Sequence, residues 1–264
     1  MLELIDIILF LITGFVAGAF GGLLGLGGAT ILVPALTLGF GLPVHMVIAV
    51  SLISNVFVSI TAAIGYNRRG LIHKRTVVIM TLGSILGVVI GTAIATKSPD
   101  DLIKLLFGIF LLVIIMEGIL RVRRKDGGLP INEPEKLNVP GLSALGFVMG
   151  LLGAILGIGG GTVATPIQHS IFRLPLKNAI ANSLATIIVS ASLGAVLYFI
   201  LGAGHLFSAR EALITAAAVV PGAIVGAKAS TVAEKYLHER HIRFIFYAVI
   251  LYIAYNMIKS GLGW

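Results

Sequence analysis

Apolar segments long enough to cross a membrane fill most of this 264-residue sequence. A membrane-spanning helix needs about 20 mostly apolar residues, because the hydrocarbon core of a bilayer is about 30 Å thick. Barrel strands alternate apolar with polar residues, and these segments do not, so helices are predicted. The expected fold class is an all-α polytopic membrane protein. Its predicted spans are residues 4–24, 45–66, 76–96, 101–120, 141–157, 177–201, 209–232 and 240–260.

The composition excludes a soluble domain. Charged residues make up 11% of the chain and the mean hydropathy is +1.06, whereas soluble domains carry about 25% charged residues. The net charge of +8 comes from Lys and Arg in short loops between apolar segments, as the positive-inside rule requires. A lipid bilayer is therefore the expected partner, and no nucleic acid. The chain has no Cys, and it shows no metal-ligand cluster, cofactor motif or nucleophile–base–acid set.

A glycine cluster followed by Thr and Pro occurs twice. Residues 24–34 read LGLGGATILVP, and residues 157–166 read GIGGGTVATP. The two halves align without gaps at an offset of 132, with 16 of 47 positions identical over residues 24–70. This similarity indicates an internal duplication. We predict a transmembrane repeat 1 (1–120), a polar linker (121–138) and a transmembrane repeat 2 (139–264), each repeat with four full transmembrane helices and one short broken helix.

The short helices, 29–39 and 161–172, decide the topology. At 1.5 Å per residue each is about 17 Å long and cannot span a bilayer alone. If each dips in and returns beside the preceding full span, the repeats are parallel. If each forms a hairpin with the helix before it, entering and leaving on one face or crossing twice, the repeats are inverted. Inversion places 15 of the 19 Lys and Arg residues on the cytoplasmic side, against 11 for parallel repeats. Loop charge sets orientation, so we favour inverted repeats, a cytoplasmic linker and both termini outside.

Both glycine breaks place the start of a short helix inside the membrane. The first N–H groups of a helix have no intrahelical partner and carry about half a positive charge together. Glycine lets a ligand approach this backbone closely. Two such ends, brought together by inverted repeats, would form an anion site near the membrane midplane. The predicted substrate-binding residues are Gly25, Gly27, Gly28, Ala29 and Thr30 in the first break, Gly159, Gly160, Gly161 and Thr162 in the second, and Ser51, Ser54, Asn55, Asn182, Ser183 and Thr186 on the following full spans.

Structural interpretations compete with these functional ones. Ser and Thr in a span can bond to their own helix. His169 and Glu117 are the candidates for proton coupling, although a structural histidine and an i,i+4 ion pair of Glu117 with Arg121 are the simpler interpretations. Glycines four residues apart are typical of close helix packing in membranes. We assign that role to Gly14 and Gly18, to Gly83, Gly87 and Gly91, and to Gly222 and Gly226.

Two stretches resemble a known family. They are GLLGLGGATILVPAL followed by LPVHMVIAVSL, and the second copy LGIGGGTVATPIQHSIFRLPLKNAIANSLAT. Both are similar to the TauE/SafE family of membrane proteins, the sulfite exporter family, and the resemblance covers nearly the whole chain. It implies an inner-membrane secondary transporter for sulfur-containing oxyanions such as sulfite, sulfoacetate and other organosulfonates. The first copy has Ala29 where the second has Gly161, so the two breaks would differ in how they approach a substrate.

The sequence thus predicts a multi-pass transporter of the cell inner membrane that moves a small anion by alternating access. An anion channel, with the two breaks as a selectivity constriction, is the alternative within the same class. A membrane-embedded enzyme or assembly subunit is the alternative from another class. The membrane-embedded enzyme or assembly subunit would need polar catalytic groups at membrane depth, and few are present. No enzymatic activity is therefore predicted. The sequence leaves open whether the protein forms a homodimer.

Overall fold

The computed structural model describes residues 4–24, 28–123, 138–233 and 239–263. Each predicted span corresponds to one helix, and within the described residues no strand is formed. The all-helical fold class is therefore confirmed. The elements are α1 (Leu4–Leu24), α2 (Ala29–Pro34), a π-helical turn η1 (Ala35–Gly39), α3 (Val44–Arg68), α4 (Lys74–Ala95), α5 (Asp100–Arg123), α6 (Val139–Leu156), α7 (Gly161–Ser170), α8 (Leu176–Gly202), α9 (Ala209–Ala233) and α10 (Glu239–Gly261).

The outer surface of the bundle is apolar. Within the residues that the structure describes, six helices, α1, α3, α4, α6, α8 and α9, are long and apolar enough to cross a membrane. Large hydrophobic side chains point outward from them, and Leu82, Leu86 and Ile200 are each more than 60% exposed. A continuous surface of this kind requires a lipid environment, because soluble monomers rarely expose large apolar patches. The chain is a multi-pass membrane protein.

Helices from the two halves of the chain pack closely against each other. Helix α1 lies along α9, and α4 lies along α6. A Cβ on Gly14 would collide with the backbone of Val219, and one on Gly87 would collide with the backbone of Phe147. Each of the other glycines predicted to pack meets a backbone atom of the facing helix in the same way. The packing role of these three glycine sets is therefore confirmed.

One helical hairpin, α6–α7, enters and leaves the bundle at a single end. Helix α6 runs parallel to α4, because Gly83 faces Ser143 and Gly91 faces Leu151. Helix α7 then leads back to the start of α8, where Asn178 Nδ2 donates to the carbonyl of Leu71, just before α4. We call this the His73 end, after the residue that precedes α4.

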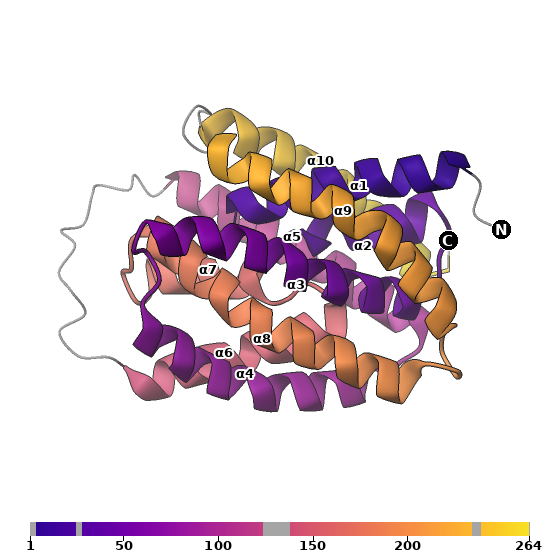
Figure 1. Ribbon diagram of the computed structural model, residues 1–264, viewed down its shortest axis with the longest axis horizontal. Helices are drawn as coiled ribbons and strands as arrows, with labels where there is room; N and C mark the ends of the chain where they lie inside the picture. Colours follow the sequence, from indigo (N-terminus) through magenta and orange to yellow (C-terminus); the bar gives the residue numbers. More distant parts are fainter. Residues whose placement is uncertain (1–3, 25–27, 124–137, 234–238, 264) are drawn as a thin grey trace.

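A second hairpin, α1–α2–η1, has both of its ends at the opposite side. Helix α1 runs parallel to α9, and η1 leads to the start of α3. There His45 meets Tyr198, near the end of α8, and we call this the His45 end. Helices α3 and α8 pack against each other and run antiparallel through the bundle, and Figure 1 places both chain termini at one end of it.

Candidate functional site

The second glycine turn, residues 157–160, connects α6 to α7 inside the bundle. Gly157, Gly159 and Gly160 have φ angles of 70°, 66° and 77°. These are left-handed conformations that cost side-chain-bearing residues about 1–2 kcal/mol each. A Cβ on Gly160 would also collide with the Met149 carbonyl of α6. Glycine is therefore required here by both the backbone conformation and the space available.

Helix α3 holds this turn through two side chains. Ser51 Oγ donates to the carbonyl of Gly157 at 2.8 Å, and Asn55 Nδ2 donates to the same carbonyl at 2.9 Å. A Cβ built on Gly159 would lie 3.0 Å from Ile187 of α8 and 3.2 Å from Asn55 of α3. The second glycine turn thus lies between α3 and α8. The sequence predicted a role for Ser51 and Asn55 beside a glycine break, and the structure brings them to the break of the other half.

The start of α7 presents buried donors that have no acceptor among the described residues. Its backbone hydrogen bonds begin with Val163 N and Ala164 N, which donate to the Gly160 carbonyl. The N–H groups of Gly161 and Thr162 precede this pattern, as the orphan donors of a helix start do. Thr162 is 4% exposed, and its Oγ1 is buried without a hydrogen-bond partner. The buried hydroxyl therefore lies on the residue that also carries one of the first N–H groups of α7, at the positive end of the helix dipole.

The first glycine break is built in a similar way where the structure describes it. Gly28 has a φ of 84° and is the N-cap of α2, and its Cβ would lie 2.6 Å from the Ala17 carbonyl of α1. Ala29 and Thr30 begin α2 and are buried. Gly25 and Gly27 lie outside the described residues.

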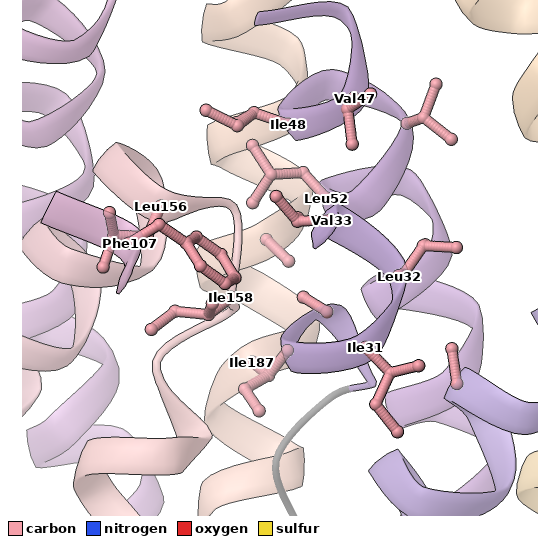
Figure 2. Close-up of a cluster of buried hydrophobic side chains, with 14 of the residues drawn as sticks. Ile31, Leu32, Val33, Val47, Ile48, Leu52, Phe107, Leu156, Ile158 and Ile187 are labelled. Carbon is pink, nitrogen blue, oxygen red and sulfur yellow. The ribbon is translucent and has the colours of Figure 1, made fainter. Parts of the chain in front are cut away.

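Apolar packing joins α2 to the second glycine turn. Ile31 and Val33 of α2 and Ile158 of the turn belong to one buried cluster, which also contains residues of α3 and α8. Figure 2 shows Ile158 in this cluster, with Phe107 and Leu156 nearest to it in the view and side chains of α2 and α3 farther away. Both broken helices therefore contribute side chains to the same continuous apolar core.

The predicted residues of α8 lie in a hydrogen-bond network that attaches α7. Thr165 Oγ1 and Gln168 Nε2 both donate to Ser183 Oγ, at 3.0 and 2.9 Å. Asn182 Nδ2 donates to Gln168 Oε1 at 3.2 Å, and Asn182 Oδ1 accepts from the backbone N–H of His73 at 2.8 Å. This network connects α7, α8 and the start of α4. Gln168 is central to it, although no sequence pattern had marked this residue for the site.

The remaining candidates occupy less central positions. Thr186 Oγ1 donates to the Asn182 carbonyl within its own helix, and Ser54 is buried on α3. His169 Nδ1 lies 2.8 Å from the Leu174 carbonyl, five residues further along the chain. This local hydrogen bond is the kind expected of a structural histidine. The side chain of Glu117 lies outside the described residues. Within the part of the chain that the structure describes, no group of His, Cys, Asp and Glu could hold a metal ion.

Replacing Ser183 by alanine is expected to lower the stability of the protein by about 1–3 kcal/mol, because Thr165 and Gln168 would each lose a buried acceptor. Thermal unfolding of the detergent-purified protein measures this loss. The matched control is Ser192→Ala, because Ser192 Oγ donates to the Ile188 carbonyl of its own helix. Equal unfolding temperatures for the two variants would contradict the expectation.

Comparison with known proteins identifies the family. A family profile described as "Sulfite exporter TauE/SafE" matches residues 10–257. The chain belongs to the TauE/SafE family. It is 27% identical to the probable membrane transporter protein YunE of Bacillus subtilis, over 97% of this chain and 98% of YunE. It is also 27% identical to a probable membrane transporter protein of Methanocaldococcus jannaschii, over 92% of this chain and 91% of that protein.

A third relative is longer than this TauE/SafE protein. The probable membrane transporter protein MamO of Magnetospirillum gryphiswaldense is 29% identical over 92% of this chain, which spans 43% of MamO. No solved structure matches the chain. The names of the family and of these relatives indicate a membrane transporter and not an enzyme.

Proposed function

We propose that this TauE/SafE protein is a secondary transporter of the cell inner membrane. It carries small sulfur-containing oxyanions, namely sulfite, sulfoacetate or other organosulfonates, by alternating access. The observation that carries the proposal is the buried hydroxyl of Thr162, which has no partner in the described residues and lies beside the first N–H groups of α7. Leaving a buried polar group unpaired costs about 1–3 kcal/mol, and a bound oxyanion would remove this cost.

Neutral hydrogen-bond donors suit a site that must both bind and release an anion. Of the Asp, Glu, Lys, Arg and His side chains that the structure describes, only His45 is buried, and it lies at one end of the bundle. An oxyanion at the start of α7 would thus be held by backbone N–H groups, a hydroxyl and a helix dipole that contributes up to about 2 kcal/mol. Such a site attracts an anion without a fixed countercharge, which allows release on the other side of the membrane.

The arrangement of the two hairpins supports alternating access. They enter the bundle from opposite ends, and α3 and α8, which match in the sequence alignment, run antiparallel. These features are those of inverted repeats related by an axis in the membrane plane. In this proposal α2 supplies a second helix start that faces the same region as α7. Gly159, Gly160, Gly161 and Thr162 are all buried, so in this proposal one half moves against the other to admit an anion.

The variant Thr162→Val tests the anion site. It keeps the side-chain shape but removes the hydroxyl, and a hydrogen bond to a charged group contributes about 1.5–3 kcal/mol. We expect affinity for the transported anion to fall by about tenfold to a hundredfold, while thermal stability is unchanged or higher. Binding of sulfite, sulfoacetate and isethionate to the purified protein measures the first quantity.

The control for this variant is Thr165→Val, on the same helix. Thr165 donates to Ser183, so its replacement should lower stability and leave the donors at the start of α7 in place. If Thr162→Val bound one of these anions with the affinity of the unaltered protein, Thr162 would not belong to the site. Absence of binding and of transport for all three anions in the unaltered protein would overturn the proposed function.

A further inference from the structure

His45 is a buried ionisable residue that the proposed anion site does not use. It lies in the first turn of α3, and its side chain is 3% exposed. Polar groups from three other segments surround its ring: the carbonyl of Ser98, the carboxylate of Asp100 and the hydroxyl of Tyr198. These groups come from the α4–α5 turn, from α5 and from α8, so the imidazole connects four segments at the His45 end.

The two ring nitrogens have different kinds of partner. Nε2 lies 3.1 Å from the Ser98 carbonyl and 3.2 Å from Asp100 Oδ1. Both are acceptors, so Nε2 carries a hydrogen in either charge state of the ring. Nδ1 lies 3.2 Å from Tyr198 Oη. It accepts a hydrogen bond from the tyrosine hydroxyl when the imidazole is neutral, and it donates one to the tyrosine oxygen when the imidazole is charged. Protonation of His45 therefore reverses the hydrogen bond between α3 and α8.

Asp100 supplies the countercharge for the charged imidazole, through the hydrogen on Nε2. Its side chain is 43% exposed and reaches the buried ring directly. The neighbouring Asp101 is paired with Lys104 at 3.3 Å, which leaves Asp100 as the carboxylate of α5 that faces His45. Phe207 stacks on the Tyr198 ring, with 6.4 Å between the two ring centroids. The exposed side chains Lys97, His205 and Arg210 lie on the adjoining segments, and among the described residues none of them pairs with His45.

The helices joined by His45 are the helices that hold the anion site. Ser51 follows His45 by six residues on α3, about 9 Å along the helix, and Tyr198 lies on α8 with Asn182 and Ser183. The other end lacks an equivalent histidine: at the alignment offset of 132, Tyr66 matches Tyr198, but exposed Lys177 matches His45. His73, at that other end, contacts Asn178 and is not among the buried side chains, so of the described histidines His45 alone is buried.

We infer that His45 is a proton-binding site, paired with Asp100 and linked to Tyr198, that couples anion movement to proton movement. This inference rests on the proposed transport function. A positive charge on α3 and an anion beside the same helix attract each other, so each raises the affinity of the protein for the other by the same factor. The anion and the proton consequently move in the same direction.

The test uses purified protein in liposomes and two anions, isethionate and sulfate, that do not titrate between about pH 5.5 and 8, the range in which histidine changes charge. Sulfite itself titrates there and is unsuitable. With an alkaline interior, the unaltered protein should accumulate the labelled anion. H45Q preserves hydrogen bonding but cannot take up a proton, and we expect its gradient-driven accumulation to fall at least about tenfold. Its counterflow, the exchange of labelled for unlabelled anion at equal pH, should persist.

Matched variants separate a proton site from a structural role. D100N should reduce gradient-driven accumulation, whereas D101N, whose carboxylate pairs with Lys104, should accumulate as the unaltered protein does. Accumulation by H45Q equal to that of the unaltered protein would overturn the inference and leave the proposed function standing.

If the unaltered protein showed no counterflow of either anion, this result would instead count against the proposed function. The proton site is then decided by imidazole NMR of the protein in nanodiscs. A signal absent from H45Q that titrates between about pH 5 and 8, with a midpoint moved by Y198F, supports His45 as a proton-binding group. A His45 signal that stays constant over this range overturns it.

Discussion

Replacing Gly160 by alanine is expected to abolish anion transport while leaving folded protein in the membrane. Gly160 has a φ of 77° as the N-cap of α7, and an added Cβ would collide with the Met149 carbonyl of α6. The backbone strain alone costs about 1–2 kcal/mol, which a packed bundle can tolerate. The collision, however, must displace the start of α7, and with it the donors of Gly161 and Thr162. A misplacement of about 1 Å in a positioned site costs on the order of a hundredfold in rate.

Gly41→Ala is the matched control for this prediction. Gly41 has a φ of 65°, close to that of Gly160, but no atom lies within 4 Å of its Cβ position. The two variants therefore share the backbone strain and differ in the collision. Uptake of labelled anion by liposomes, normalised to the folded protein in size-exclusion chromatography, measures the difference. Equal uptake by Gly160→Ala and Gly41→Ala would show that the start of α7 does not hold the anion.

The helices of this fold could be predicted from the sequence because the solvent for most of the chain is lipid. Apolar length then decides where a helix runs, and even the short helices were placed correctly, since Gly28 and Gly160 interrupt otherwise continuous apolar segments. The packing glycines were equally predictable, because spacing by four residues puts them on one helix face. Local sequence carries both signals.

The polar contacts could not be predicted, because they join residues far apart in the sequence. His45 and Tyr198 are separated by 153 positions, and His73 and Asn182 by 109. Neither the sequence around the histidine in LPVH nor the apolar segment around the tyrosine predicts a contact between these two side chains. The available signal was the alignment of the halves: Pro43 and Pro175 both precede a full span as its N-cap, and each is followed after one residue by His45 or Lys177. Two such positions with different ionisable residues mark the two ends of the bundle.

Gly87→Leu is expected to prevent folding, unlike Gly160→Ala. Gly87 of α4 faces the Phe147 carbonyl and lies close to the Leu151 nitrogen of α6, so its missing side chain allows the two backbones to touch. Gly150 of α6 meets the Ser84 carbonyl in the same way from the opposite side. A leucine must therefore separate the helices along their whole contact. Overpacking costs about 1–3 kcal/mol even where neighbouring side chains can move, and a backbone cannot move aside as they do.

The measurement is the yield of monodisperse protein in fluorescence-detected size-exclusion chromatography. Val89→Leu, two residues further along α4, is the control, because Val89 is 47% exposed on the outward face and a larger apolar side chain there adds only contact with lipid. We expect a normal yield for Val89→Leu and a severe loss for Gly87→Leu. Since α1 and α9 touch through Gly222 and the Leu11 carbonyl in the same manner, Gly222→Leu should fail equally. A normal yield for either glycine variant would contradict a bundle in which each half is held by direct backbone contact with the other.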